Sequence, residues 1–266
     1  MSRQTFKSWS ATRLHDYELC ALAAYLKHTA KLCPICFDGS IKGGYDSPAV
    51  CSSGKGCKIE VGAPLVRGSR LDASIEKYIM GKGDLDKEIV NKQVLAIINK
   101  LKAAYKRKEV EAQLEIRLDA NWKPVAHMFN GVWFRGKLDA LWKTGEAWSA
   151  IDWKSGGIDK RTGKIRASNK YDDQLSLYSL ATLSAFPKAE EVQGTLVFID
   201  TPNHADPKVE RPKTDLDRDG LEKAKKKWSL RVEPMMSDTI FAPKPSPDAC
   251  RFCAYKKSAG GPCDFG

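Results

Sequence analysis

Eight cysteines in three groups constrain this 266-residue chain more than any other feature. The groups are Cys20 alone, then Cys33, Cys36, Cys51 and Cys57, and finally Cys250, Cys253 and Cys263. The last group is one thiolate short of the four that a tetrahedral metal site needs, so Cys20 is its natural partner. The alternative is that Cys20 is an ordinary small buried residue. The first of these interpretations predicts a metal centre that joins the two ends of the chain.

The cellular compartment determines whether the cysteines are expected to form disulfides or to bind metal. The first ten residues, MSRQTFKSWS, hold no apolar run of the signal-peptide type. The longest uncharged run, Gln174–Pro187, has 14 residues, too few for a transmembrane helix. We therefore expect a cytosolic protein without membrane contact. Because a reducing compartment disfavours disulfides, metal binding is the expected role of the thiols.

The four central cysteines resemble a zinc-ribbon-like site. CPIC is followed by 14 residues and then by C-x5-C, and a CxxC turn places two sulfurs beside one ion. Several glycines, Gly39 among them, permit tight turns. A segment this short and polar needs a metal in order to fold. We predict Zn²⁺ on Cys33, Cys36, Cys51 and Cys57; the alternative is a loop of inert thiols.

The charge balance favours a polyanionic partner. The chain has 44 basic and 33 acidic residues, a net charge of +11, which suits nucleic acid. The alternative is a basic protein that its charge keeps soluble.

A hairpin in the middle of the chain carries the candidate chemistry. Residues 132–142 and 147–155 have the pattern of two strands that flank Lys143-Thr144-Gly145-Glu146. Residues two apart share a strand face, so Asp152 and Lys154 project together, and Asp139 reaches the same place across the hairpin. Two carboxylates suit Mg²⁺ or Mn²⁺. The alternative is an exposed ion pair.

Further elements follow from periodicity. Residues 171–186 predict a helix that Asp172 or Asp173 caps and that has Gln174 and Tyr178 on one face. Residues 192–199 predict a fully buried strand. Upstream, an amphipathic helix is indicated by Val90, Val94, Ile97, Ile98 and Leu101.

In this order the motifs resemble the PD-(D/E)XK nuclease superfamily. The resemblance rests on Asp139, on Ile151-Asp152-Trp153-Lys154 and on Gln174-x-x-x-Tyr178. The ends, SWSATRLHDYELC and FAPKPSPDACRFCAYKKSAGGPC, are similar to those of its RecB-like iron–sulfur exonucleases. That branch includes CRISPR-associated exonucleases, the AddB nuclease domain and phage exonucleases.

The resemblance implies an α/β fold of the restriction-endonuclease type, a central mixed sheet flanked by helices. It divides the chain into an N-terminal helix with the first cluster cysteine (1–30), a four-cysteine insertion (31–62), a nuclease core (63–240) and a C-terminal cysteine segment (241–266). It also implies a [4Fe–4S] cluster, for which zinc is the alternative, on Cys20, Cys250, Cys253 and Cys263. The insertion has three open roles: contact with DNA, contact with a partner, or stabilisation.

The site residues carry over one by one. Asp139, Asp152 and the Trp153 carbonyl match the metal ligands of the family, and Lys154 matches its catalytic lysine. Gln174 and Tyr178 match the motif that supports the site. The helix 66–79 resembles the helix that contributes a histidine ligand and a glutamate. Glu76 matches that glutamate, whereas Asp72 stands at the histidine position and either replaces this ligand or faces solvent. Glu111 is a less well placed carboxylate.

The expected function is a Mg²⁺- or Mn²⁺-dependent exonuclease that hydrolyses single-stranded DNA from its ends, with endonuclease activity as a lesser expectation. It would act in recombination, repair or phage- or CRISPR-related DNA processing. No GxxxxGK[ST] motif of a helicase occurs. The alternative is an adaptor that binds DNA ends within a recombination or CRISPR-adaptation complex, with little turnover.

Overall fold

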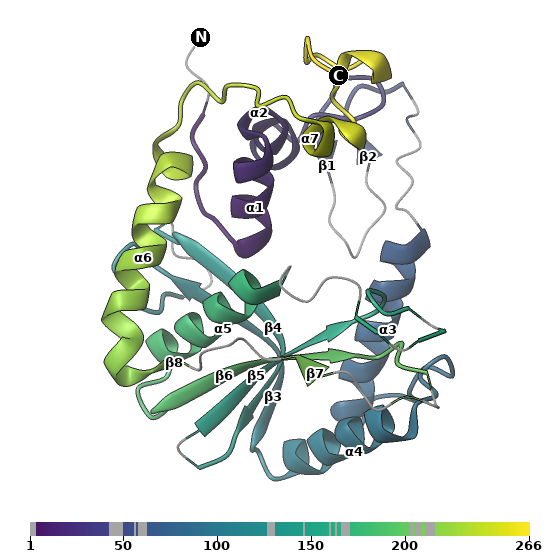
Figure 1. Ribbon diagram of the computed structural model, residues 1–266, viewed down its shortest axis with the longest axis vertical. Helices are drawn as coiled ribbons and strands as arrows, with labels where there is room; N and C mark the ends of the chain where they lie inside the picture. The colour runs from purple at the N-terminus through teal and green to yellow at the C-terminus, as the bar shows by residue number, and fades with distance from the viewer. Residues whose placement is uncertain are drawn as a thin grey trace. The chain divides into compact units, whose positions relative to one another are not determined.

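The computed structural model in Figure 1 is divided into two compact units. The central unit is Gly62–Lys227, and the terminal unit combines Met1–Val61 with Trp228–Gly266. The structure describes residues 4–42, 50–55, 57, 63–126, 131–145, 147–159, 161–162, 164–165, 171–202, 205, 209–210 and 216–266. Residues 43–49, 56 and 58–62 of the predicted insertion therefore lie outside the described part.

A mixed sheet forms the middle of the central unit. Its strands are β3 (Val110–Leu118), β4 (Phe134–Lys143), β5 (Ala147–Lys154), β6 (Glu191–Phe198) and β7 (Val209–Glu210), in that order, and β8 (Leu216–Asp217) also pairs with β6. The β5–β6 pair is parallel and the other described pairs are antiparallel. The expected hairpin is therefore β4–β5, with Gly145 at φ +57° in its turn.

Two helices cover one face of this sheet and a third covers the other. One face packs Ile151, Trp153 and Val197 against α3 (Ala63–Ile79) and α4 (Lys92–Lys106). On the other face, Leu175 of α5 (Asp172–Ala185) packs on Leu196 and Phe198 (Figure 1). Alternate residues of β6 thus serve opposite cores, as the pleat of a doubly covered strand requires. The mixed α/β fold class expected from the sequence is confirmed.

A close approach of backbones fixes α5 on the sheet. This helix forms the crossover between the parallel strands β5 and β6, as parallel pairing demands. A Cβ atom on Gly194 of β6 would lie 2.8 Å from the Leu175 Cβ and 3.0 Å from its carbonyl oxygen. Only glycine permits this approach, which sets the depth of α5 and hence of Gln174.

Two details of the expected helices are corrected. Val90 is 52% exposed and precedes α4, because the side chain of Asn91 accepts the N–H groups of Gln93 and Val94 and begins the helix there. Likewise, Tyr171 occupies the N-cap of α5. Asp172 and Asp173 lie in its first turn, where carboxylates complement the helix dipole.

The terminal unit packs the beginning of the chain against its end. Its elements are α1 (Ala11–Leu19), α2 (Ala21–Ala24), a π-helical turn η1 (Tyr25–Thr29), the short hairpin β1 (Ile41–Lys42) and β2 (Val50–Cys51), α7 (Pro247–Arg251) and a 3-10 turn η3 (Lys257–Ala259). Helix α6 (Arg218–Ser237) crosses from the central unit into this one. Arg231 donates two hydrogen bonds, of 2.6 and 2.8 Å, to the carboxylate of Glu18. The rings of Trp9 and Trp228 stack.

Within the described part of the chain, none of the helices combines the length and the apolar character that crossing a bilayer requires.

Candidate active site and cysteine centres

The candidate site lies where the β4–β5 hairpin opens. The paired residues of this hairpin end at Ala140 and Ile151. One position further, Asp139 Oδ2 accepts the backbone N–H of Trp153 at 2.8 Å. A side chain thus takes the place of the neighbouring strand as acceptor. The strand pairing gives way here to two neighbouring carboxylates, those of Asp139 and Asp152.

Asp152 is the most connected of these groups. It is only 4% exposed. Gln174 Nε2 donates to its Oδ1 at 3.0 Å and to the Tyr178 hydroxyl at 2.7 Å, and that hydroxyl lies 3.5 Å from the same carboxylate oxygen. Lys154 forms an ion pair with Asp152. The face shared by Asp152 and Lys154 is therefore the face that α5 covers, as alternation along β5 predicts.

Burial raises the pKa of both acids, and the charge of Asp152 adds to the rise at Asp139. Burial, followed by the charge of Asp152, raises the pKa of Asp139 to about 8. Burial also raises the pKa of Asp152, against the opposing effects of Lys154 and Tyr178. Such shifts are typical of functional sites, and a cation placed among the carboxylates would reverse them.

Asp72 joins the site from helix α3. Burial and then the charge of Asp152 raise its pKa to about 6, while Lys154 and Lys137 oppose the shift. Its Oδ1 is buried and has no hydrogen-bond partner among the described residues. One turn earlier, Gly68 lies so close to Ser155 that a Cβ atom there would be 2.8 Å from the serine hydroxyl. Asp72 therefore faces the carboxylates rather than bulk solvent.

The other candidate residues are placed less centrally. Glu76 is half-buried, one turn beyond Asp72 on α3. The side chain of Trp153 is in the core, and its backbone N–H bonds Asp139. Glu111 on β3 forms an ion pair with Lys143, which gives its carboxylate a partner of its own.

One residue near the site, Lys137, is not among the candidates predicted from the sequence. Lys137 acts on the charge of Asp72 and lies two positions before Asp139 on β4. The signal was the position of Lys137 in the sequence, two residues before a candidate metal ligand. It was overlooked because an exposed lysine on a strand is common.

The four central cysteines gather as expected. The sulfur atoms of Cys33, Cys36, Cys51 and Cys57 all lie within 4.8 Å of one another. Tetrahedral ligands about 2.3 Å from one ion would be about 3.8 Å apart, so this set fits a single metal ion. The Ser53 hydroxyl lies 3.3 Å from Cys36 and 3.0 Å from Cys51. Hydrogen bonds, that from Ser53 first, lower the pKa of Cys36 to about 5, which favours the thiolate that a metal binds.

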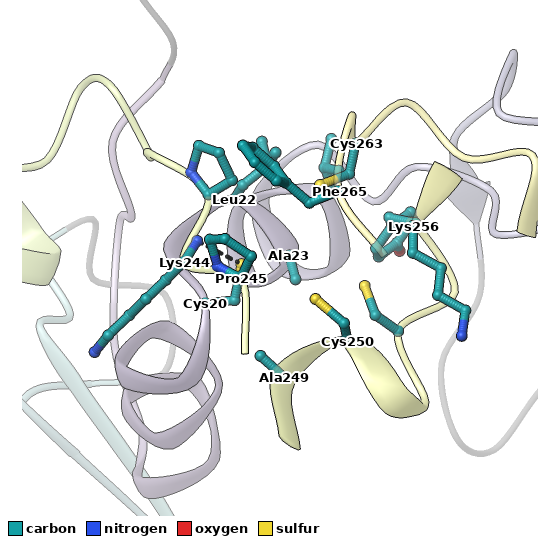
Figure 2. Close-up of a pocket in the computed structure, with 14 residues that line it drawn as sticks. Cys20, Leu22, Ala23, Lys244, Pro245, Ala249, Cys250, Lys256, Cys263 and Phe265 are labelled. Carbon is teal, nitrogen blue, oxygen red and sulfur yellow. Dashed lines mark hydrogen bonds between the residues drawn. The ribbon is translucent and has the colours of Figure 1, made fainter. Parts of the chain in front are cut away.

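The remaining four cysteines line one cavity of the terminal unit, shown in Figure 2. Cys20 lies at the junction of α1 and α2, and Cys250 is in α7. Cys253 and Cys263 complete the set, and burial and then its sulfur neighbours raise the pKa of Cys253. Unlike the central set, these sulfurs are not all within 4.8 Å of one another among the described residues.

Comparison with known proteins identifies the family. The model of the PD-(D/E)XK nuclease superfamily matches residues 8–258. No curated protein matches the chain. Among solved structures, the chain is similar to a "Putative exonuclease" from Eubacterium rectale at 12% identity and a TM-score of 0.48, with 92% of this chain and 87% of that chain covered. It is also similar to SSO0001 at 15% identity and a TM-score of 0.31, with 65% and 67% covered. Because the family model extends over nearly the whole sequence, the chain belongs to the PD-(D/E)XK nuclease superfamily.

Proposed function

We propose that this protein is a divalent-metal-dependent deoxyribonuclease of the RecB-like type, which acts as an exonuclease on single-stranded DNA ends. Membership of a nuclease superfamily supports hydrolysis of nucleic acid. One observation carries the assignment of the site. Buried Asp152 lies beside Asp139, is paired with Lys154 and is bonded by Gln174.

The carboxylates fit a hard cation. Mg²⁺ and Mn²⁺ prefer oxygen ligands, and the unpartnered Asp72 oxygen and the repulsion between Asp139 and Asp152 would both be relieved by positive charge. Asp139, Asp152, the Trp153 carbonyl, Asp72 and Glu76 would hold it. When bound, such an ion supplies Lewis-acid activation of water and of the phosphate.

The remaining site residues position Asp152 and neutralise the charge that develops during the reaction. Lys154 steadies the water and the charge that develops on the phosphate. Gln174 holds Asp152 by a hydrogen bond to one oxygen, which leaves the other oxygen to Lys154. Burial and the charge of Asp152 raise the pKa of Tyr178 well above its ordinary value, so that its hydroxyl stays a neutral donor to this carboxylate.

The cysteine centres hold different groups in this proposal. Cys33, Cys36, Cys51 and Cys57 bind Zn²⁺, because their sulfurs suit one tetrahedral ion. Cys20, Cys250, Cys253 and Cys263 bind a [4Fe–4S] cluster, because the four cysteines line one cavity and all-thiolate ligation suits such a cluster. The cluster would fix the last segment of the chain to its first helix.

A role in recombination, repair or CRISPR-related processing, with protein partners from those systems, completes the proposal. The RecB-like motif order and the terminal cysteines support it.

The deciding experiment is a nuclease assay on 5′- and 3′-labelled single-stranded DNA with Mn²⁺, Mg²⁺ or EDTA, using anaerobically purified protein. We expect cleavage that requires the ion and is lost in Lys154→Ala. Lys100→Ala, an exposed lysine of α4, is the matched control and should cleave normally. Tight DNA binding without cleavage in either metal would overturn the assignment in favour of an adaptor.

A further inference from the structure

Two cations on β4 lie next to the candidate active site and have no role in the proposed chemistry. Phe134, Gly136, Leu138 and Ala140 are buried, whereas Arg135 and Lys137 between them are exposed. Because side chains alternate along a strand, Arg135 and Lys137 share one face, opposite to Gly136, on which a Cβ atom would lie 3.8 Å from the ring of Tyr178 of α5. The two cations therefore form a row that begins two residues from a candidate metal ligand.

Lys137 is close enough to the carboxylates to act on them. Its positive charge interacts electrostatically with the Asp72 carboxylate, as the charge of Lys154 does. Two lysines from different strands thus flank the same acidic group. Only Lys154 is paired with an acid at the site, through Asp152.

The side chains of Arg135 and Lys137 are available to a ligand. Neither forms a hydrogen bond or an ion pair with any residue that the structure describes. The acid opposite Lys137 on β3 is Glu115, and two hydrogen bonds of 2.8 and 2.7 Å tie it to Arg117. The nearest cross-strand carboxylate is therefore neutralised by another residue.

We propose that Lys137 and Arg135 form a binding site for the backbone phosphates next to the scissile phosphate, so that the DNA strand follows the exposed face of β4. The place of the scissile phosphate rests on the proposed nuclease function. Residues two apart in a strand are about 6.8 Å apart, a spacing of the same order as that between successive phosphates. Because the contacts are to phosphates, they position the strand without selecting its sequence.

The first test measures binding without cleavage. Fluorescence anisotropy of a short labelled single-stranded oligonucleotide in EDTA gives Kd over a range of salt concentrations. We expect Lys137→Gln and Arg135→Gln each to weaken binding and to reduce the slope of log K against log salt by about 0.7, the value for one phosphate contact to a single strand. Lys137→Arg and the control Lys100→Gln should keep the wild-type slope.

A second measurement locates the phosphate. In a set of oligonucleotides, each has one neutral methylphosphonate linkage at a different position. One linkage should weaken wild-type binding but have no further effect in Lys137→Gln, because the contact is already lost. Equal losses in both proteins at every linkage, or unchanged Kd and slope in both glutamine variants, would overturn the site.

The two proposals fail separately. Suppose that the wild-type protein never cleaves but the glutamine variants reduce the slope of log K against log salt. The phosphate-binding site would then be supported and the nuclease function rejected. Cleavage by the wild-type protein, combined with unchanged salt slopes in both variants, would support the nuclease function and reject the phosphate-binding site.

Discussion

The carboxylate of Asp139 accepts the backbone N–H of Trp153 at 2.8 Å, at the position where the pairing of β4 with β5 ends. One side chain thus has two tasks, to close the open end of the hairpin and to present negative charge at the site. These tasks can be separated by substitution, because asparagine retains an acceptor oxygen but not the charge.

Asp139→Asn should therefore remove activity while preserving the fold. We expect metal-dependent cleavage to fall at least a hundredfold. Above pH 8, where Asp139 is ionised, the melting temperature should stay the same or rise, because a repelling charge has gone. Asp139→Ala leaves the Trp153 N–H without its acceptor and should lose about 1–3 kcal/mol of stability. Calorimetry and cleavage assays on both variants check this, with exposed Asp84→Asn as the control. Equal destabilisation by Asn and Ala would contradict it.

Tyr178→Phe tests how Asp152 is kept ionised. The hydroxyl of Tyr178 and the charge of Lys154 oppose the rise in the Asp152 pKa that burial causes. Without the hydroxyl this pKa rises further, so the low-pH limb of the cleavage profile should move to higher pH. The rate at neutral pH should fall roughly tenfold, equivalent to about 1.4 kcal/mol. A lower rate with an unshifted pH profile would indicate a structural effect only.

Gly194→Ala should damage the site through packing. The new methyl group would overlap the Leu175 backbone of α5, and Gln174 is the preceding residue. We expect a loss of about 1–3 kcal/mol, typical of overpacking, together with reduced cleavage. Gly83→Ala, where a Cβ atom would meet only the Lys77 side chain at 3.5 Å, is the control. Denaturant unfolding of both variants measures the difference, and equal stability would refute the packing argument.

The metal-free protein should lose stability as pH rises. The pKa of Asp72 is raised to about 6 and that of Asp139 to about 8, so the folded chain binds these protons more tightly than the unfolded chain. The stabilisation is complete below the ordinary pKa near 3.8 and disappears as pH rises through 6 and then 8. Melting in EDTA should therefore occur at lower temperature at pH 8 than at pH 5.

Added Mg²⁺ gives the complementary result. An ion that competes with the protons should raise the melting temperature more at pH 8 than at pH 5. In Asp139→Asn both the pH dependence and the response to Mg²⁺ should shrink. Melting that is independent of pH in wild-type protein with EDTA would show that these acids are not perturbed.

The sequence was sufficient to predict which side chains lie together where the short repeat of a strand or a helix determines their direction. Alternation along β5 predicted that Asp152 and Lys154 face away from Ile151 and Trp153, and a four-residue spacing placed Gln174 with Tyr178. Both patterns are local, so no knowledge of distant packing was needed.

Long-range proximity explains what the sequence left open. The orientation of Asp72 depends on where α3 packs, which no pattern within the helix determines. The start of α4 depended on whether the Asn91 side chain or the apolar pattern through Val90 prevailed, and the capping hydrogen bonds prevailed. The glycine at 194 matters only because of α5, which is distant in sequence.

The four-cysteine centre gives the last prediction. A Cβ atom on Gly39 would lie 2.8 Å from the Cys51 sulfur and 2.6 Å from the Ser53 backbone nitrogen, so an alanine cannot fit without displacing a ligand. In the proposed zinc site, Gly39→Ala should lower the zinc content measured by plasma mass spectrometry from one ion per chain to a small fraction. Cys36→Ser should do the same, whereas Gly83→Ala should retain the ion. Full zinc occupancy in Gly39→Ala, or no zinc in wild-type protein, would refute the assignment of this centre.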